Sequence, residues 1–307
     1  MRIGINGSSL LVRPEIGTIT TDIVTAEAEG FRSYWLAQTG LADALGVLGA
    51  AGPGTNVIQL GTAVVPTWTQ HPMALAASAL TAQSASHGRL VLGIGLSHQP
   101  AVEGRWHLRW EKPIRHVLDY LDVLQPLLAG ETVQHRGEVW SLTNDGPLPR
   151  PTEDPPKVML AALGDQMLRI AGRRTDGTIL WCVGPRTIET HIAPRLHDAA
   201  DDADRDAPAI VCSIPCWVTD DPQPARDFIA QILSVYAELP SYRSMLDIEG
   251  VHGLGELSFV GTEQEVRDRI GAVAAAGATD FTAVVMGGNP DETAATRALL
   301  AAIAAEG

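Results

Sequence analysis

Cysteine is scarce in this chain of 307 residues, in which only Cys182, Cys212 and Cys216 occur. A small, odd number of cysteines, with no signal-peptide pattern at the first residues, is typical of a reducing compartment. Positive charge is also in deficit: 22 Lys and Arg stand against 36 Asp and Glu, a formal net charge of −14. Apolar runs such as 90–96 are far shorter than the roughly 20 residues of a membrane span. We therefore expect a cytoplasmic protein that binds neither nucleic acid nor membrane.

Motifs for hydrolytic, metal-dependent and nucleotide chemistry are missing as well. The sequence contains no H-E-x-x-H, no G-x-S-x-G and no Walker A loop. Cys212 and Cys216 lie four residues apart on the β-rich run 210–218, which places them on the same face of a strand. We interpret them as small buried apolar residues rather than a metal or redox pair, and we expect no metal site.

What the sequence does have is enough apolar residue, 45%, for a large core, and a regular alternation of strand and helix patterns. The predicted strands are 3–6, 33–37, 57–65, 90–95, 158–162, 178–182, 210–218 and 280–286. The predicted helices are 18–30, 43–51, 71–86, 114–128, 166–174, 186–202, 224–238, 263–275 and 291–305. We expect a hairpin or loop insertion at 132–142 and irregular chain at 239–258.

This order predicts an α/β protein, a single (β/α)8 TIM barrel over 1–307 with loop insertions after strands 4 and 7. A doubly wound sheet is the competitor, but the turn after its first strand usually reads G-x-G-x-x-G, and here it reads Asn6-Gly7-Ser8-Ser9. In a barrel the active site lies at the carboxyl ends of the strands. Those ends carry small or apolar residues at 63–65, 95–97 and 161–164. Such ends suit a flat ring system, so a cofactor is expected to supply the chemistry.

Gly164 precedes the predicted helix at 166–174, where backbone N–H groups and the helix dipole favour a phosphate. An ordinary turn glycine explains the same residue equally well.

Several segments together resemble a known family, the luciferase-like flavin and deazaflavin oxidoreductases. They are 30–35, 60–66 followed by His71-Pro72, 88–95, 161–164 with 171–177, and 261–266 with 276–278. The resemblance covers most of the chain, and it implies a reduced flavin-type cofactor across the barrel mouth, either coenzyme F420 or FMN. The compact length and the segment 95–98 are closer to the F420-dependent branch.

The resemblance also implies places for the cofactor. Ala63 and Val64 match a non-prolyl cis peptide that lies behind the ring in deazaflavin members. The other expected cofactor contacts are Gln38 and Thr39 beside the ring, Leu96, Ser97 and His98 at its edge, and Ala162, Leu163 and Gly164 along the phosphate-bearing tail.

One departure from the family bears on the reaction. Sugar-phosphate dehydrogenases of the deazaflavin branch carry an Asp-His pair after strand 2 and a Glu after strand 4, whereas this chain has Gln38-Thr39 and His98. The resemblance therefore favours a reductase, or at least a different substrate, over a sugar-phosphate dehydrogenase. His98 is the expected proton donor, with Thr39 relaying the proton or fixing a substrate oxygen. Alternatively, His98 binds a loop carbonyl or the cofactor.

Tryptophans are the expected substrate contacts: Trp68, Trp106 and Trp181, with Trp110 on the same loop as Trp106. Packing or contacts within a homodimer, a frequent assembly in the family, explain loop tryptophans equally well. Three functions stay open: an F420-dependent oxidoreductase, an FMN-dependent monooxygenase that uses O2, and a non-catalytic ligand-binding barrel. The sequence leaves the substrate and the direction of the reaction undetermined.

Overall fold

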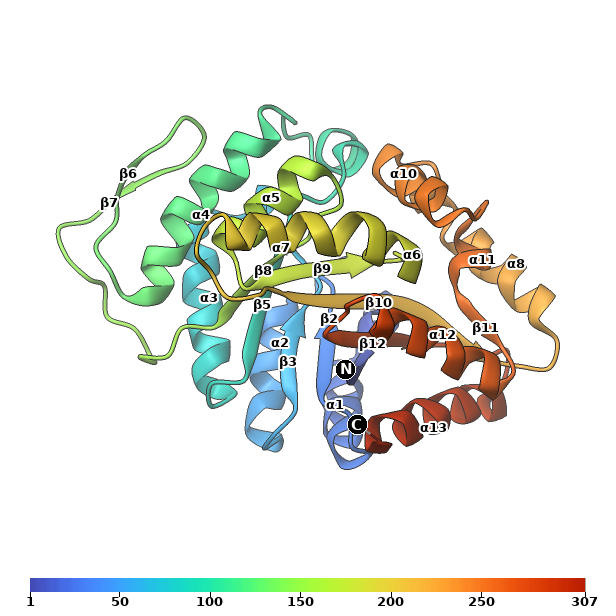
Figure 1. Cartoon of the computed structure of the whole chain (residues 1–307). Helices are drawn as coiled ribbons and strands as arrows, with labels where there is room; N and C mark the ends of the chain where they lie inside the picture. Colours follow the sequence, from blue (N-terminus) through green and yellow to red (C-terminus); the bar gives the residue numbers. More distant parts are fainter. Residues whose placement is uncertain (307) are drawn as a thin grey trace.

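Eight parallel strands close into a barrel in the computed structural model, which describes residues 1–306 (Figure 1). The hydrogen-bonded order is β1, β2, β3, β5, β8, β9, β10 and β12, and β12 pairs back with β1. The strands are β1 (Arg2–Asn6), β2 (Ser33–Leu36), β3 (Gln59–Thr62), β5 (Leu90–Gly95), β8 (Lys157–Leu160), β9 (Gly177–Trp181), β10 (Ala209–Val218) and β12 (Asp280–Val285). The predicted (β/α)8 barrel is confirmed.

Helices cover the outside of this barrel. They are α1 (Ile16–Ala28), α2 (Ala44–Ala51), α3 (Pro72–Ala85), α4 (Pro113–Ala129), α5 (Asp165–Arg174), α6 (Pro185–Thr187), α7 (Ala193–Asp201), α8 (Pro222–Ile232), α9 (Ser234–Ala237), α10 (Pro240–Glu249), α11 (Leu254–Leu257), α12 (Glu263–Ala275) and α13 (Pro290–Glu306). Short 3-10 turns occupy η1 (Gly7–Val12), η2 (Gly52–Gly54) and η3 (Thr67–Thr69), and π-turns occupy η4 (Pro100–Arg105) and η5 (Ile188–Ile192).

Local sequence explains where several helices begin. The Asp43 carboxylate accepts from the backbone N–H groups of Leu45 and Gly46 at the start of α2. The His71 ring accepts from Met73 N–H before Pro72, the first residue of α3. Each cap satisfies an N–H group that the helix itself leaves without a partner.

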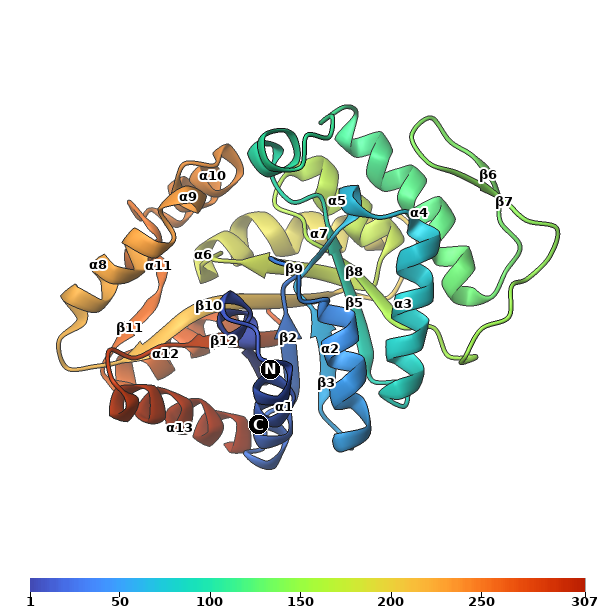
Figure 2. The same ribbon diagram turned by 180° about the vertical axis from the view of Figure 1, so that it is seen from behind.

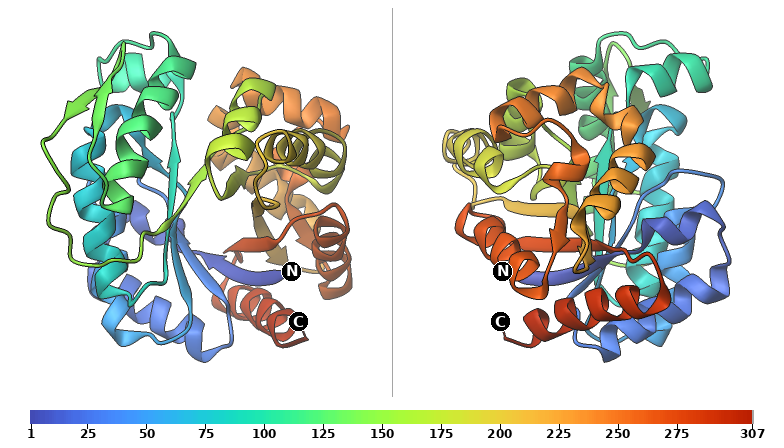
Figure 3. Two further views of the ribbon diagram at one scale, coloured as in Figure 1. Left: turned by 60° about the vertical axis from the view of Figure 1, so that its left-hand side comes forward. Right: turned by 90° about the vertical axis from the view of Figure 1, so that its right-hand side faces the viewer.

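Four short strands lie outside the barrel circuit. β4 (Val65–Pro66) continues β3 after a break and pairs with β5, and β11 (Phe259–Gly261) pairs with β10. β6 (Gln134–Arg136) and β7 (Ser141–Thr143) form the antiparallel hairpin expected within 132–142. This hairpin runs along α4, and α8 to α11 gather on the opposite side of the barrel (Figures 2 and 3).

The barrel interior is filled by side chains from alternate positions of the strands. Trp35 is the largest, and it forms one buried cluster with Val91, Met159, Ile179 and Val211. The neighbouring positions of each strand face the helices. On β10 these include Cys212 and Cys216, which are buried and unpaired, as the sequence predicted.

Two predicted elements are wrong in detail. The run 57–65 is not one continuous strand, because the chain leaves the ladder between β3 and β4, and Val57 lies outside β3 with 70% of its surface exposed. The stretch 239–258 is not irregular, because it forms α10 and α11. Pro240 begins α10, and Gly250 ends it with a φ of 83°, a left-handed conformation that glycine adopts without cost.

Candidate active site

The carboxyl ends of the barrel strands form the mouth, where barrels of this kind carry their sites. The predicted cofactor segments follow β2, β3, β5 and β8. Because β3 and β8 both pair with β5 in parallel, the segments after these three strands are neighbours at the mouth. The structure therefore brings together three of the four predicted backbone segments directly, and β2, which pairs with β3, adds the fourth.

The segment after β3 has a fixed place. The peptide bond between Ala63 and Val64 is cis, as the resemblance implied. Ala63 N–H donates to the Leu36 carbonyl at 2.8 Å, and Gln38 N–H donates to the Val64 carbonyl at 3.1 Å. These bonds tie the segment to the end of β2. Ala63 and Val64 are half-buried and offer a small apolar surface at the mouth.

Gln38 and Thr39, the two residues predicted beside the ring, differ in their surroundings. The Gln38 amide nitrogen donates to the carbonyls of Gly40 and Ala42, and its oxygen accepts from Ala44 N–H at 2.8 Å. This side chain is thus used to hold the loop before α2. Thr39 is exposed, and within residues 1–306 no hydrogen bond joins it to His98. The role expected for Thr39, relaying the proton or fixing a substrate oxygen, stays a prediction.

His98 lies at the mouth after β5. Its ring stands edge-on to Tyr236 and Tyr242, with a centroid separation of 5.7 Å to each. Burial lowers the pKa of His98 below its usual 6.5, so the ring is mostly neutral at pH 7. A proton delivered by His98 at that pH has first to be taken up from solvent. The preceding Ser97 has a φ of 60°, which turns the chain sharply at the strand end.

The segment after β8 leads into α5. Leu163 O accepts from His191 Nε2 at 2.8 Å, which fixes the loop, and Gly164 is the residue before the first helical position. A side-chain carbon added at Gly164 would meet nothing within 4 Å. A shallow cavity of about 430 Å³, wide open to solvent, lies here, and its lining is Leu96, Trp110, Pro113, Ile114, Gly164, Asp165, Gln166 and Met167. It joins two predicted cofactor residues, Leu96 and Gly164.

The predicted substrate tryptophans occupy different environments. Trp68 stacks on His116 with 3.8 Å between ring centroids and lies 5.5 Å from Trp110, so it packs within the wall beside α4. Trp106 is half-buried on the loop after η4. Trp181, at the end of β9, faces Tyr236 at 6.3 Å. Of the three predicted residues, Trp181 is the one placed beside His98 through the shared neighbour Tyr236.

A hydrogen-bonded chain that the sequence analysis missed connects the hairpin with the mouth. Trp140 Nε1 donates to His116 Nδ1 at 3.2 Å, and His116 Nε2 lies 2.9 Å from the Thr67 hydroxyl. The Thr67 hydroxyl in turn donates to the Gly95 carbonyl at 3.4 Å. This sequence of donors assigns the proton of a neutral His116 to Nε2. His116 falls on the apolar face of its helix, which is the signal that could have identified it.

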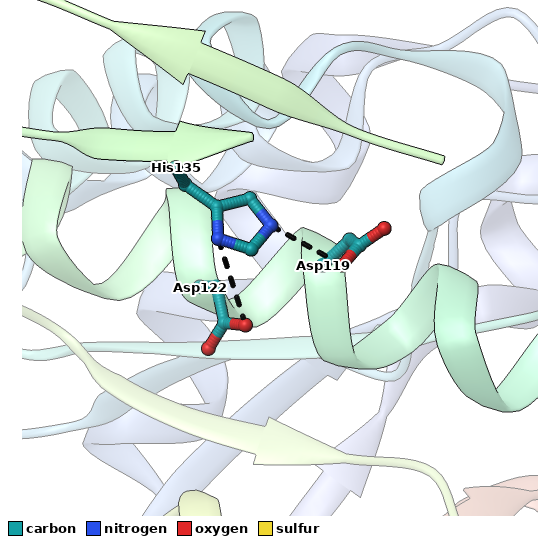
Figure 4. Close-up of side chains that lie close together, drawn as sticks. All are labelled: Asp119, Asp122 and His135. Carbon is teal, nitrogen blue, oxygen red and sulfur yellow. Dashed lines mark hydrogen bonds and ion pairs between the residues drawn. The ribbon is translucent and has the colours of Figure 1, made fainter. Parts of the chain in front are cut away.

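Asp119, Asp122 and His135 are brought together beside the hairpin (Figure 4). His135 Nε2 lies 3.2 Å from Asp119 Oδ1, and His135 Nδ1 lies 3.8 Å from Asp122 Oδ2. Arg115 pairs with Asp119, and Arg174 pairs with Asp122. Because each carboxylate already has a cationic partner, we interpret the cluster as a clamp that holds β6 on α4 rather than a metal site.

Replacing Asp119 with asparagine is expected to loosen the hairpin. Asp119 is buried and accepts from Val139 N–H at 2.7 Å as well as from His135 and Arg115. Burial opposes ionisation, but these donors lower the pKa of Asp119 overall. The substitution would remove the charged acceptor, at a cost of about 2 kcal/mol in the free energy of unfolding. Faster amide hydrogen exchange confined to 133–144 would support this, and unchanged exchange there would contradict it.

A family model for luciferase-like monooxygenases matches residues 6–280. The chain belongs to the luciferase-like monooxygenase family. Members of this family are oxidoreductases that use flavin-like cofactors. The match contains all the barrel strands from β2 to β10, and it extends from the last residue of β1 to the first residue of β12.

Individual relatives are consistent with this membership. The chain is 29% identical over 218 residues to an F420-dependent glucose-6-phosphate dehydrogenase of Segniliparus rotundus, covering 66% of this chain and 64% of that protein. Its fold is similar to that of the coenzyme F420-dependent tetrahydromethanopterin reductase of Methanopyrus kandleri, with a TM-score of 0.79, 20% identity and coverage of 98% and 96%. The fold is also similar to that of the FMN-bound oxygenating constituent of 3,6-diketocamphane monooxygenase of Pseudomonas putida, with a TM-score of 0.77 and 16% identity. That match covers 98% of this chain and 97% of the other.

Residues 1–306 contain no helix that is both long enough and apolar enough to cross a membrane.

Proposed function

We propose that the protein is a coenzyme F420-dependent reductase that transfers a hydride from the reduced deazaflavin to a small organic substrate. The observation that carries this proposal is the form of the mouth. Leu96 after β5 and Gly164 after β8 line a shallow cavity of about 430 Å³ at the N-terminus of α5, and the small apolar segment Ala63–Val64 follows β3, which pairs with β5. A flat ring suits the apolar strand ends, and a phosphate-bearing tail suits the cavity at the start of α5.

The residues at the mouth fit such a cofactor. The apolar surface of Ala63 and Val64 suits one face of the ring, and the backbone of Leu96 and Ser97 suits its edge. Gly164 leaves space at the start of α5, where the helix dipole and free N–H groups favour a phosphate. Asp165 carries a negative charge at this point, but it pairs with Arg195 at 2.8 Å.

Reduced deazaflavin, when bound, supplies a hydride, and the substrate needs one further proton for each hydride that it accepts. His98 is the titratable ring at the mouth that the sequence predicted for this proton. Its lowered pKa makes it a transfer group between solvent and substrate rather than a stored acid. Reduction of an activated C=C or C=N bond requires no more from the protein than this proton and the positioning of both partners.

Reduction is supported over sugar oxidation by the end of β2. The relative from Segniliparus rotundus is named as a glucose-6-phosphate dehydrogenase. In this chain the corresponding loop carries Gln38-Thr39, and the Gln38 amide is bonded within the loop. Neither side chain is a base that could remove a proton from a sugar hydroxyl at neutral pH.

An anaerobic fluorescence titration with oxidised and reduced F420, run in parallel with FMN, tests the proposed cofactor. We expect F420 to bind in the micromolar range and FMN to bind more weakly. Preference for FMN, together with oxygen uptake when the reduced protein is exposed to air, would replace the proposal with a monooxygenase. Binding of neither cofactor would overturn the assignment of the mouth.

Replacing Gly164 with leucine should block the tail of the cofactor. The new side chain projects into open space, so it should leave folding intact, but it occupies the entrance at α5. We expect cofactor affinity to fall at least about tenfold, a loss of about 1.4 kcal/mol. Gly146, near the hairpin, is a matched control, because a side-chain carbon there also meets nothing within 4 Å. If Gly164→Leu and Gly146→Leu bind the cofactor with equal affinity, the phosphate-bearing tail does not lie at the start of α5.

A further inference from the structure

Four aromatic rings from separate elements meet at the mouth, and we call them the aromatic box: His98, Trp181, Tyr236 and Tyr242. Tyr236, on α9, lies 5.3 Å from Tyr242 on α10, measured between ring centroids. His98 and Trp181 approach these tyrosines from the ends of β5 and β9. The box belongs neither to the cavity at α5 nor to the stack around His116.

The box contains polar donors that the protein itself does not use. Trp181 Nε1 is shut off from solvent and has no acceptor among residues 1–306. No hydrogen bond from the Tyr236 hydroxyl is found in the same part of the chain. An indole N–H that is buried without an acceptor costs about 1–3 kcal/mol, so a bound acceptor atom would recover that cost.

The surroundings of the box restrict the ligand. Trp181 and Tyr236 pack against a cluster of buried apolar side chains, which includes Leu239, Leu246, Leu254 and Leu257. A charged ligand would lose its hydration against this apolar surface. Flat rings, by contrast, pack well against aromatic walls. The ligand should therefore be planar and uncharged, and it should carry at least one hydrogen-bond acceptor.

We propose that the aromatic box binds the substrate as a planar conjugated ketone or imine, whose heteroatom accepts hydrogen bonds from Trp181 Nε1 and the Tyr236 hydroxyl. This inference rests on the proposed function, because it names the substrate class for the same mouth. The rings touch one another in this structure, so the Tyr236 ring has to turn before a ligand fits against Trp181 Nε1, and the Tyr236 hydroxyl then donates to the ligand from its new position. Tyr236 lies on α9, a helix of four residues after α8. Burial raises the pKa of Tyr236, which keeps its hydroxyl a donor across the neutral range.

The test compares two ligands of the same shape by isothermal titration calorimetry, with and without oxidised F420. They are benzylideneacetone and its methylene analogue, in which C=CH2 replaces C=O. We expect Trp181→Phe and Tyr236→Phe each to weaken the ketone about fivefold, the size of one hydrogen bond, and to leave the hydrocarbon unchanged. Tyr120→Phe is the matched control, since its hydroxyl donates to Gln70 O, outside the box.

Equal weakening of both ligands by the two variants would show that the box only packs, and would overturn the inference. Absence of ketone binding to the wild-type protein would do the same. If Trp181→Phe does not fold by circular dichroism, Tyr236→Phe alone decides. Should ketone discrimination follow the variants while neither F420 nor FMN binds, the box stands and the proposed cofactor fails.

Discussion

Replacing Gly93 with alanine is expected to destabilise the barrel by about 3 kcal/mol or more in the free energy of unfolding. A methyl group on Gly93 would lie 1.9 Å from the Thr62 carbonyl oxygen and 2.4 Å from Ile179 Cδ1. The first of these atoms is backbone and has no room to retreat. Gly93 N–H also donates to the Thr62 hydroxyl at 2.8 Å, and this hydroxyl donates back to the Gly93 carbonyl at 2.8 Å.

These contacts replace backbone pairing at the point where β3 leaves the ladder. The pairing of β3 with β5 ends at Gly61, which is opposite Val91. Pairing with β5 resumes at Val65 in β4, which is opposite Ile94. The Thr62 hydroxyl satisfies both polar groups of Gly93 across the interruption. Pushing the two strands apart would therefore displace the segment 63–64, so cofactor binding should weaken in any Gly93→Ala protein that folds.

Urea denaturation of Gly93→Ala and Gly271→Ala measures this effect. Gly271 is an exposed glycine inside α12, and a side-chain carbon there meets nothing within 4 Å. Alanine at 271 should stabilise the helix by about 0.5–1 kcal/mol, because glycine is a poor helix former. A Gly93→Ala protein within about 1 kcal/mol of the wild type would show that the strands separate at little cost.

The strands of the barrel could be predicted wherever burial on both faces made the sequence continuously apolar. β5 is an example, because all its residues from Leu90 to Gly95 are buried. Apolarity alone could not reveal the interruption within 57–65. That interruption depends on hydrogen bonds from Ala63 to Leu36 and from Gln38 to Val64, which join positions far apart in the sequence.

Local signals were present for α10 but were not sufficient. Pro240 and Gly250 bound the helix as its first residue and its C-terminal cap. On the apolar face between them, Tyr242 and Leu246 pack in the cluster that Trp181 contacts, and Met245 packs in the main core. A short helix of this kind is stabilised by its packing more than by its own sequence.

For the candidate site, the sequence could predict the position of the backbone segments but not the contacts of their side chains. Segments such as 63–64, 96–98 and 162–164 could be placed at the mouth because a parallel barrel carries every strand end to one side. The side-chain partners could not be predicted. Nothing in the sequence shows that the Gln38 amide is bonded within its loop, or that the ring of His98 lies against two tyrosines.

His116 is expected to make the stability of the protein depend on pH. Burial lowers its pKa to about 4 in the folded state, although Asp119 acts in the opposite direction, and its ordinary value is 6.5. Above pH 6.5 the ring is neutral in both states, so stability is complete. Between pH 6.5 and about 4 only the unfolded chain takes up the proton. Stability therefore falls with decreasing pH, by about 3 kcal/mol over the whole interval.

Urea denaturation at pH 7 and pH 5 measures the part of this loss that precedes protonation of most carboxylates, about 2 kcal/mol. His116→Phe keeps a ring against Trp68 but removes the titrating group. The free energy of unfolding of this variant should therefore fall by about 2 kcal/mol less than that of the wild type between pH 7 and pH 5. His252→Phe, which removes an exposed imidazole, is the control. An unchanged pH dependence in His116→Phe would mean that His116 takes up a proton in the folded protein as easily as in the unfolded chain. Protonation would break the bond from Trp140, so the connection between the hairpin and the mouth requires a neutral His116.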